Sequence, residues 1–161
     1  MDRKTIVVIV AIIILAITSY FLNQDDNDQS NHYYMFKMDE KSESWELDHY
    51  TVELVPTYQI AGYGELSFVG DERNVATEVD LQVTAYLEEG IEILLQSKTY
   101  DFDEPTELST LKTDSTETDF FKPNGDPVIF DEIKTIEAVI HWSDGDQIFQ
   151  EEMELYNKYE R

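Results

Sequence analysis

The chain is 161 residues long and strongly acidic, with 35 aspartates and glutamates against 11 lysines and arginines, so its formal net charge is −24 at pH 7. A surface of this charge repels nucleic acids and other polyanions, which excludes a nucleic-acid-binding role. The chain has no cysteine, which excludes disulfide bonds and thiolate metal sites.

The first predicted element is an uncharged apolar stretch of 18 residues from Thr5 to Leu22. A helix of this length covers about 27 Å, close to the ~30 Å hydrocarbon core of a bilayer. Arg3 and Lys4 precede the stretch and acidic residues follow it, so the positive-inside rule predicts a cytoplasmic N-terminus at residues 1–4. We therefore expect a single-pass protein of the cell membrane, with lipid around residues 5–22 and the C-terminal domain outside.

A cleaved signal peptide is the alternative, because it shares the basic start and the apolar core. The cleavage site distinguishes the two. Residues 16–18 and 17–19 match a small-x-small site poorly, and the apolar character continues through Tyr20, Phe21 and Leu22. This pattern favours an uncleaved signal anchor.

Residues 23–32 contain no apolar side chain and include three aspartates. Because such a segment has nothing to bury, we expect it to be a flexible acidic spacer. The remaining residues, 33–161, are enough for one domain with a single hydrophobic core.

From Tyr33 onward the sequence consists of short β-like runs separated by turn residues. In the run from Ser44 to Leu54 the alternation of apolar residues changes phase after Leu47. A β-bulge between Leu47 and Tyr50 would bring both groups of apolar residues to one face.

The runs 58–60 and 65–69 flank the sequence Gly62-Tyr-Gly64. A phosphate-binding loop would need a following helix and further motif residues, and both neighbours here have strand character. We therefore expect a β-hairpin with its turn at the two glycines.

The strongest strand signal is the period of two that is sustained from Val75 to Leu87. Residues 88–90 form a turn signal, and residues 91–100 run back, so the sequence predicts a second hairpin. Residues 101–126 are acidic, rich in serine and threonine and interrupted by two prolines. We expect them to be the least regular part of the domain.

Two runs, 133–142 and 147–155, flank the sequence Asp-Gly at residues 144–145. Asp-Gly favours a two-residue type I′ turn, which would pair Ile140 with Phe149 on the core-facing side. Short strands with turn signals and without alternating helices predict an all-β fold, an antiparallel immunoglobulin-like β-sandwich, with an open barrel as the alternative.

The stretch Phe36-Lys-Met-Asp-Glu-Lys-Ser-Glu-Ser-Trp45 and the closing Ile136-Glu-Ala-Val-Ile-His-Trp142 with its Asp-Gly hairpin resemble small envelope proteins of Bacillus-like bacteria. Those proteins are often lipoproteins with a β-sandwich of unknown function. The resemblance covers residues 36–54 and 133–155 and implies an envelope location and this fold, but no site residue. The acylated cysteine of the lipoproteins is absent here, which favours a protein anchor.

No residue pattern predicts catalysis. The histidines at positions 32, 49 and 141 form neither an HExxH motif nor an i, i+4 pair, and there is no Gly-x-Ser-x-Gly elbow. The carboxylates are too numerous to single out an acid/base pair. We therefore expect no enzymatic activity and no cofactor.

Two functions remain. The first is a non-enzymatic binding or structural module at the outer face of the membrane, with a protein partner there. The second is a divalent-cation-binding domain, because acidic turns supply the hard oxygen ligands that such ions prefer. Its candidate ligands are Asp101, Asp103, Asp144 and Asp146. None of these turns has the spacing of a D-x-D-x-D-G loop, so the first function is favoured.

Overall fold

The computed structural model describes residues 33–55, 58–71, 74–119 and 121–160, and all structural statements below refer to these residues. The chain from Tyr33 to Arg161 forms one compact unit. The expected anchor and spacer, together with Arg3 and Lys4, lie outside the described residues. In the described part of the chain, no helix has the length and apolar character needed to cross a membrane.

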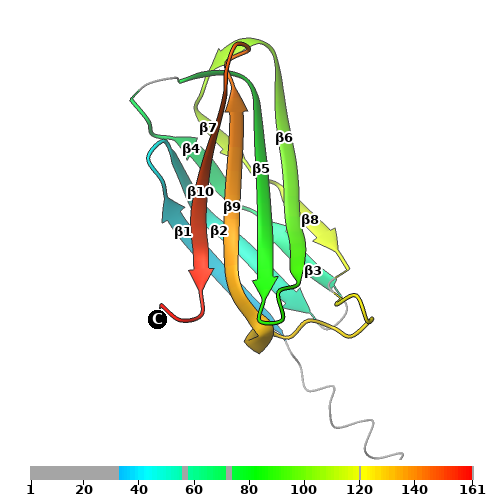
Figure 1. The fold of residues 1–161 in the computed structure, drawn as a ribbon. Helices are drawn as coiled ribbons and strands as arrows, with labels where there is room; N and C mark the ends of the chain where they lie inside the picture. Colours follow the sequence, from blue (N-terminus) through cyan, green and yellow to red (C-terminus); the bar gives the residue numbers. More distant parts are fainter. Residues whose placement is uncertain (1–32, 56–57, 72–73, 120, 161) are drawn as a thin grey trace, which may run out of the picture. The chain divides into compact units, whose positions relative to one another are not determined.

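The described residues form ten strands and one short 3₁₀-helix, so the all-β prediction is confirmed (Figure 1). In chain order the elements are β1 (Tyr34–Lys41), β2 (Trp45–Val55), β3 (Tyr58–Gly62), β4 (Glu65–Phe68), β5 (Val75–Leu87), β6 (Glu92–Glu107), β7 (Thr110–Lys112), β8 (Ser115–Thr118), η1 (Phe130–Glu132), β9 (Ile133–Ser143) and β10 (Ile148–Asn157).

The strands make two antiparallel sheets, one behind the other in Figure 1. In the first sheet, β2 pairs with β1 on one side and with both β3 and β4 on the other, and β8 and β7 extend the order to β7-β4-β2-β3-β8. In the second sheet the order is β10-β9-β5-β6. The predicted hairpin of residues 75–87 and 91–100 is confirmed as β5 and β6.

The core lies between the sheets, where alternate residues of each strand point inward. In β5, Val79, Leu81 and Val83 are fully buried, and the residues between them are polar. Trp45 of β2 meets Trp142 of β9 edge-on across the two sheets, with 5.7 Å between the ring centroids. Because the chain has no cysteine, burial of these side chains supplies the stability that disulfides give to many extracellular domains.

In the first sheet, β3 and β4 form one row beside β2, and β8 and β7 form the next row. Regular strand geometry is interrupted at the same level in β2 and in both of these rows, along one line. The line runs through His49 within β2, Tyr63 between β3 and β4, and Asp114 between β7 and β8. These three have positive φ angles of 60°, 59° and 54°, and no other non-glycine residue among those described has a positive φ. We call His49, Tyr63 and Asp114 the kink line.

Among the three rows that carry the kink line, strand pairing keeps one register, whereas β1 shifts by one residue along β2. Thr51 pairs with Gly62 and Asp48 pairs with Glu65, so β3 and β4 follow one another along β2 without a shift. Likewise, β8 pairs with β3 and β7 pairs with β4 without a shift in register. At this line the alternation of inward-facing and outward-facing residues changes phase. In β2, for example, Leu47 and Tyr50 are three positions apart in the sequence, and both are fully buried. The predicted bulge between these two residues is confirmed.

The predicted hairpin at Gly62-Tyr-Gly64 is wrong, because β3 and β4 do not pair with each other. The glycines instead permit close backbone contacts at the kink line. A Cβ atom on Gly62, whose φ is 127°, would collide with the carbonyl oxygen of Asp114, and one on Gly64 would lie 2.9 Å from the carbonyl oxygen of Asp48. The segment therefore kinks and continues in one direction where a turn was expected.

The register predicted for the closing hairpin is wrong by two residues. Phe149 pairs with Trp142, and Ile140 pairs with Glu151, because four residues, 144–147, connect β9 and β10 in place of a two-residue turn. A shift of two residues leaves the facing of each side chain unchanged. Phe149 therefore still packs against the core, but it is only partly buried.

The longer connection is stabilised by its first residue. Oδ1 of Asp144 accepts hydrogen bonds from the backbone N–H groups of Asp146 and Gln147, at 3.0 and 2.8 Å. The aspartate side chain thus closes the connection as an Asx-turn.

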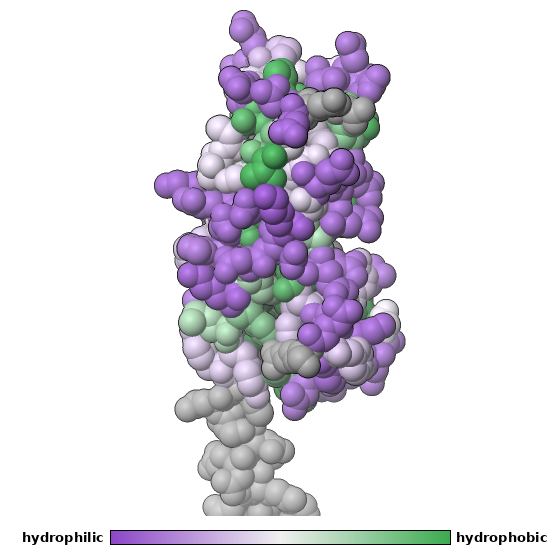
Figure 2. Space-filling model, turned by 90° about the vertical axis from the view of Figure 1, so that its left-hand side faces the viewer, coloured by the Kyte–Doolittle hydropathy of each residue, from purple (hydrophilic) through white to green (hydrophobic). Residues whose placement is uncertain are grey.

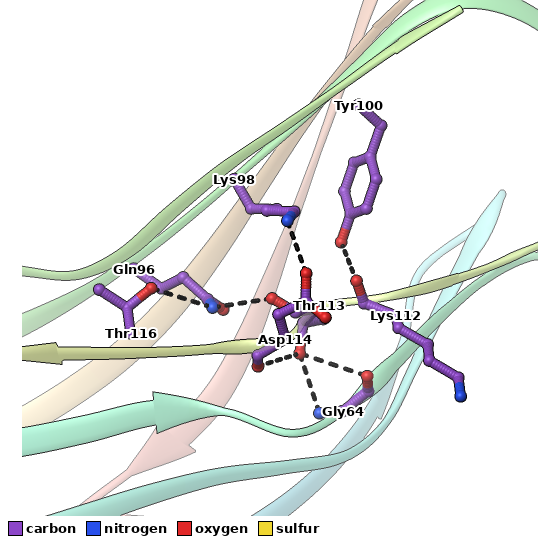
Figure 3. Close-up of polar contacts among 8 residues, drawn as sticks. All are labelled: Gly64, Gln96, Lys98, Tyr100, Lys112, Thr113, Asp114 and Thr116. Carbon is purple, nitrogen blue, oxygen red and sulfur yellow. Dashed lines mark hydrogen bonds and ion pairs between the residues drawn. The ribbon is translucent and has the colours of Figure 1, made fainter.

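Residues 101–126, which were expected to be the least regular part of the domain, include the end of β6 and all of β7 and β8. Side chains of β6 hold this edge of the first sheet to the second sheet (Figure 3). Nε2 of Gln96 donates to the carbonyl oxygen of Thr113 at 2.9 Å, and Nζ of Lys98 lies 2.6 Å from Oδ2 of Asp114. These contacts lie in space between strands, so the local composition does not reveal them.

Two ionisable groups of this edge have shifted pKa values. Burial, with the charge of Asp114 nearby, raises the pKa of Tyr100 to about 12, and its hydroxyl donates to the carbonyl oxygen of Lys112 at 2.8 Å. The hydrogen bond and the charge of Lys98 lower the pKa of Asp114. The edge is thus a fixed polar contact between the sheets at neutral pH.

The kink line gives a test with a matched pair of substitutions. Gly62→Ala is expected to destabilise the protein by more than about 3 kcal/mol, because the new Cβ must displace the backbone at Asp114. Gly90 also has a positive φ, 76°, but open space surrounds it. Gly90→Ala should therefore cost only the strain of that conformation, about 1–2 kcal/mol. Urea unfolding measures both, and equal losses would contradict the close contact at Gly62.

Candidate functional site

A groove of about 600 Å³ opens at one end of the domain, within the size range of ligand sites in proteins. It lies between the β1–β2 turn, the β4–β5 connection and the paired strands β9 and β10, and β1 begins at the opposite end of the domain (Figure 1). The described residues that line it are Glu43, Ser44, Val69, Gly70, Asp71, Trp142, Phe149, Gln150 and Glu151.

Glu151 is the unusual residue of the groove, because it is a carboxylate in the core-facing row of β10. Phe149 and Met153 occupy the neighbouring positions of that row, and the residue paired with Glu151 is Ile140, which is fully buried. Oε2 of Glu151 accepts hydrogen bonds from Oγ of Ser42 at 2.5 Å and from the N–H of Ser44 at 3.0 Å. The carboxylate thus links the second sheet to the β1–β2 turn of the first.

The two hydrogen bonds decide the charge of Glu151. Burial alone would raise its pKa, but the bonds from Ser42 and Ser44 favour the charged form and hold the pKa below its ordinary value. Glu43 and Asp71 bring two more carboxylates to the groove, and no lysine or arginine is among the described residues that line it. Three of the described lining residues are thus carboxylates.

Backbone hydrogen bonds fix the walls of the groove. The carbonyl oxygen of Ser44 accepts from the N–H groups of Val69 and Gly70 at 2.8 and 3.2 Å, which attaches the β4–β5 connection to the β1–β2 turn. The N–H of Ser42 donates to the carbonyl oxygen of Trp45 at 2.8 Å, which closes that turn. These hydrogen bonds hold the two connections that line the groove to one another.

Aromatic rings form the apolar part of the groove. Trp142 lies 5.4 Å from Phe149 and 5.7 Å from Trp45, measured between ring centroids. Phe68 packs edge-on against Trp45 at 5.1 Å. Trp142 and Phe149 line the groove itself, so carboxylates and aromatic rings share one surface.

Figure 2 shows the edge of the molecule formed by β1 and β10, which is hydrophilic over most of its area with hydrophobic groups visible along the middle. Toward the start of β1 this edge is closed by aromatic rings. Phe36 lies 5.3 Å from Tyr156, and Tyr34 lies 5.0 Å from Phe130, measured between ring centroids. The space between the sheets is filled at that end, and the groove lies at the other.

The four cation ligands predicted from the sequence lie in two separate places. Asp101 and Asp103 are exposed on the far part of β6, and Asp144 and Asp146 belong to the β9–β10 connection. Within the described residues, none of the four belongs to a group of three or more possible metal ligands with atoms close enough to share an ion.

One such group exists elsewhere in the described part of the chain, at the kink line. The ligand atoms of Asp39, Asp48 and His49 lie within 4.8 Å of one another. Oδ1 of Asp39 already accepts hydrogen bonds from both the backbone N–H and Nδ1 of His49, and these bonds lower the pKa of Asp39. We interpret this exposed group as a support for the bulge in β2.

The sequence reasoning missed both Glu151 and Asp39. A signal for Glu151 was present, because the alternation Phe149-x-Glu151-x-Met153-x-Leu155 places a carboxylate in an otherwise apolar row. No sequence signal was available for Asp39, since its contact with His49 depends on the pairing of β1 with β2 and on a positive φ.

No protein-family model matches the sequence, and no curated protein or solved structure matches the chain.

The lowered pKa of Glu151 predicts a pH-dependent contribution to stability. A carboxylate with a lowered pKa stabilises the folded state above its ordinary pKa and loses this effect as the pH falls through the lowered value. Glu151→Gln should therefore reduce the free energy of unfolding by about 1–2 kcal/mol at pH 7 and by much less below about pH 4. Glu152→Gln, an equal change in charge at an exposed position of β10, is the control. A loss at Glu151 that does not vary with pH would contradict the assignment.

A second prediction concerns the cation candidates. We expect calcium to change the melting temperature no more than sodium at matched ionic strength, because Asp144 closes a turn and Asp101 and Asp103 belong to no ligand group. A calcium site occupied at 100 times its Kd would instead add about 2.7 kcal/mol. Asp144→Asn keeps the oxygen that closes the turn and removes the charge. A selective rise with calcium that Asp144→Asn or Asp101→Asn abolishes would make metal binding the leading function.

Proposed function

We propose that this protein is a single-pass, membrane-anchored binding module of a bacterial cell envelope, with its domain outside the membrane and without enzymatic activity. The observation that carries the proposal is the groove at the end of the domain opposite Tyr34, where β1 begins. A chain tethered through the residues before Tyr34 has this groove at the far end of its domain, where a partner has access to it.

We propose the membrane anchor from features of the amino-acid sequence. The uncharged stretch at residues 5–22 has the length of a membrane span, and Arg3 and Lys4 lie on the side expected to face the cytoplasm. The resemblance to envelope proteins of Bacillus-like bacteria supports the same location. An acidic exterior also suits a domain outside the cell, because it keeps an exposed domain soluble.

We further propose that the domain is an immunoglobulin-like sandwich. In that fold, strands A, B and E share one sheet and strands C, F and G share the other. The observed order supports this assignment if β2 is A, the β3/β4 row is B, β5 is C, the β7/β8 row is E, and β9 and β10 are F and G. On this assignment β1 is an additional strand, and β6 lies beside C in the second sheet.

Protease treatment of intact protoplasts tests the location. We expect added protease to remove the domain and to leave a small membrane-bound remnant, because the positive-inside rule places the domain outside. A cytoplasmic protein serves as the control for intact membranes. Full protection of the domain would reverse the proposed orientation. Recovery of the domain in the medium, with an N-terminus near Tyr20, would show a cleaved signal peptide instead.

A further inference from the structure

We propose that the outer face of the second sheet holds a pH-sensitive contact, in which proton uptake around Glu137 strengthens the pairing of β9 with β10 as the pH falls below neutral. Strand register, burial and charge carry this proposal, which does not depend on the proposed function. Four glutamates form the contact, and we call them the outer glutamates: Glu92 of β6, Glu137 of β9, and Glu152 and Glu154 of β10.

Strand register sets Glu137 against two glutamates of β10. Glu154 pairs directly with Glu137, and Glu152 is two positions away on the same side of β10. Ala138 and Met153, which alternate with these glutamates and pair with each other, are buried in the core. The glutamates therefore point away from the core. Like charges that lie opposite each other in an antiparallel pair are destabilising.

Glu137 is the least exposed of the outer glutamates, because β9 is a central strand with a neighbour on each side. Its side chain is partly buried, whereas Glu92, Glu152 and Glu154 lie on the edge strands β6 and β10 and are exposed. The exposed glutamates can turn toward water. Glu137 cannot move away from its neighbours in the same way, so the cost of charging this face is greatest there.

The groups around Glu137 favour its neutral form. Burial raises the pKa of Glu137 most, and the charges of the other three outer glutamates raise it further. Lys134, at the start of β9, opposes them with a smaller effect. Tyr86 of β5 also faces the group and stays neutral, since burial and the charges of three of the same glutamates raise its pKa.

The raised pKa gives the direction of the effect. The folded chain binds the proton more tightly than the unfolded chain does, so stability rises as the pH falls through the raised pKa of Glu137. Above that value the repulsion is present in full. Below the ordinary pKa of glutamate, about 4.3, it no longer reduces stability.

Glu151, on the inner face of the same hairpin, acts in the opposite direction. Its lowered pKa keeps its contact with Ser42 and Ser44 until the pH is lower still. As the pH falls from neutral, the outer repulsion is therefore relieved before the inner contact is lost, and the β9–β10 hairpin is most stable at mildly acidic pH. The same hairpin supplies residues to the groove, so the pH of the surroundings acts on one of its walls.

The experiment measures the melting temperature of the purified full-length chain between about pH 4 and pH 8, in a non-ionic detergent at constant ionic strength. Fluorescence follows the unfolding, because Trp45 and Trp142, the only tryptophans of the chain, are buried in the core. Glu137→Gln should raise the melting temperature by about 1–4 °C near pH 7.5 and leave it nearly unchanged near pH 4. Glu117→Gln, the same change at an exposed position of β8 in the other sheet, is the control and should have less than half of this effect.

A second set of variants locates the effect at the β9–β10 pair. In a chain that already carries Glu152→Gln and Glu154→Gln, the further change Glu137→Gln should raise the melting temperature less than it does in the parent chain, because the charges that Glu137 faces are gone. Glu152→Gln alone should raise the melting temperature near pH 7.5, opposite in sign to the loss expected for Glu151→Gln.

Equal gains from Glu137→Gln and Glu117→Gln would show that the variants only lower the net charge of the chain, and they would overturn the proposal. A gain from Glu137→Gln that persists near pH 4, a loss near pH 7.5, or an undiminished gain in the chain with Glu152→Gln and Glu154→Gln would overturn it as well. None of the substituted side chains is buried, so each variant is expected to fold.

Discussion

The kink line is the constraint on which the arrangement of the first sheet depends. Three neighbouring rows carry a positive-φ residue at the same level, His49, Tyr63 and Asp114, and strand pairing keeps its register across all three. A bulge in only one of these rows would have shifted that row against the other two. Because all three rows kink at the same level, the alternation of inward-facing residues changes in all of them together. Apolar residues on both sides of the line therefore reach the same core, and the glycines beside Tyr63 make the close contacts possible.

The two sheets are held together differently along their edges. At the edge formed by β6 and the β7/β8 row, Gln96, Lys98 and Tyr100 bridge the sheets through polar contacts with the kink line and its neighbours. At the edge formed by β1 and β10, aromatic rings close one end, and the contact of Glu151 with the β1–β2 turn closes the other. The groove lies beside this last contact, where a charged residue takes a place that packing would give to an apolar one. The polar contact of Glu151 and the groove thus lie at the same end of the domain.

The acidity of the chain has several physical roles. No aspartate or glutamate among the described residues is buried, and charged groups on a surface favour solubility. Some of these carboxylates have a local task that depends on their geometry: Asp39 supports the bulge at His49, Asp144 closes the β9–β10 connection, and Glu151 links the two sheets. Each of these three residues uses one oxygen to accept two hydrogen bonds, locally within a turn for Asp144 and between separate strands for Asp39 and Glu151. Net charge alone therefore does not separate a carboxylate that solvates the surface from one that supports the fold or binds a partner.

The all-β class, the β5–β6 hairpin and the bulge in β2 could be predicted from the amino-acid sequence, because each of them follows from the alternation of neighbouring residues. The sequence also carried the apolar stretch at residues 5–22, which remains a prediction about location. Three features could not be predicted in this way: β3 and β4 form one kinked row, the β9–β10 connection has four residues, and residues 101–126 include strands. These features depend on contacts between residues far apart in the chain, such as Gly62 with Asp114 and Gln96 with Thr113. The groove belongs to the same class, since Ser44, Asp71 and Glu151 meet there only because the two sheets bring three separate connections to one end of the domain.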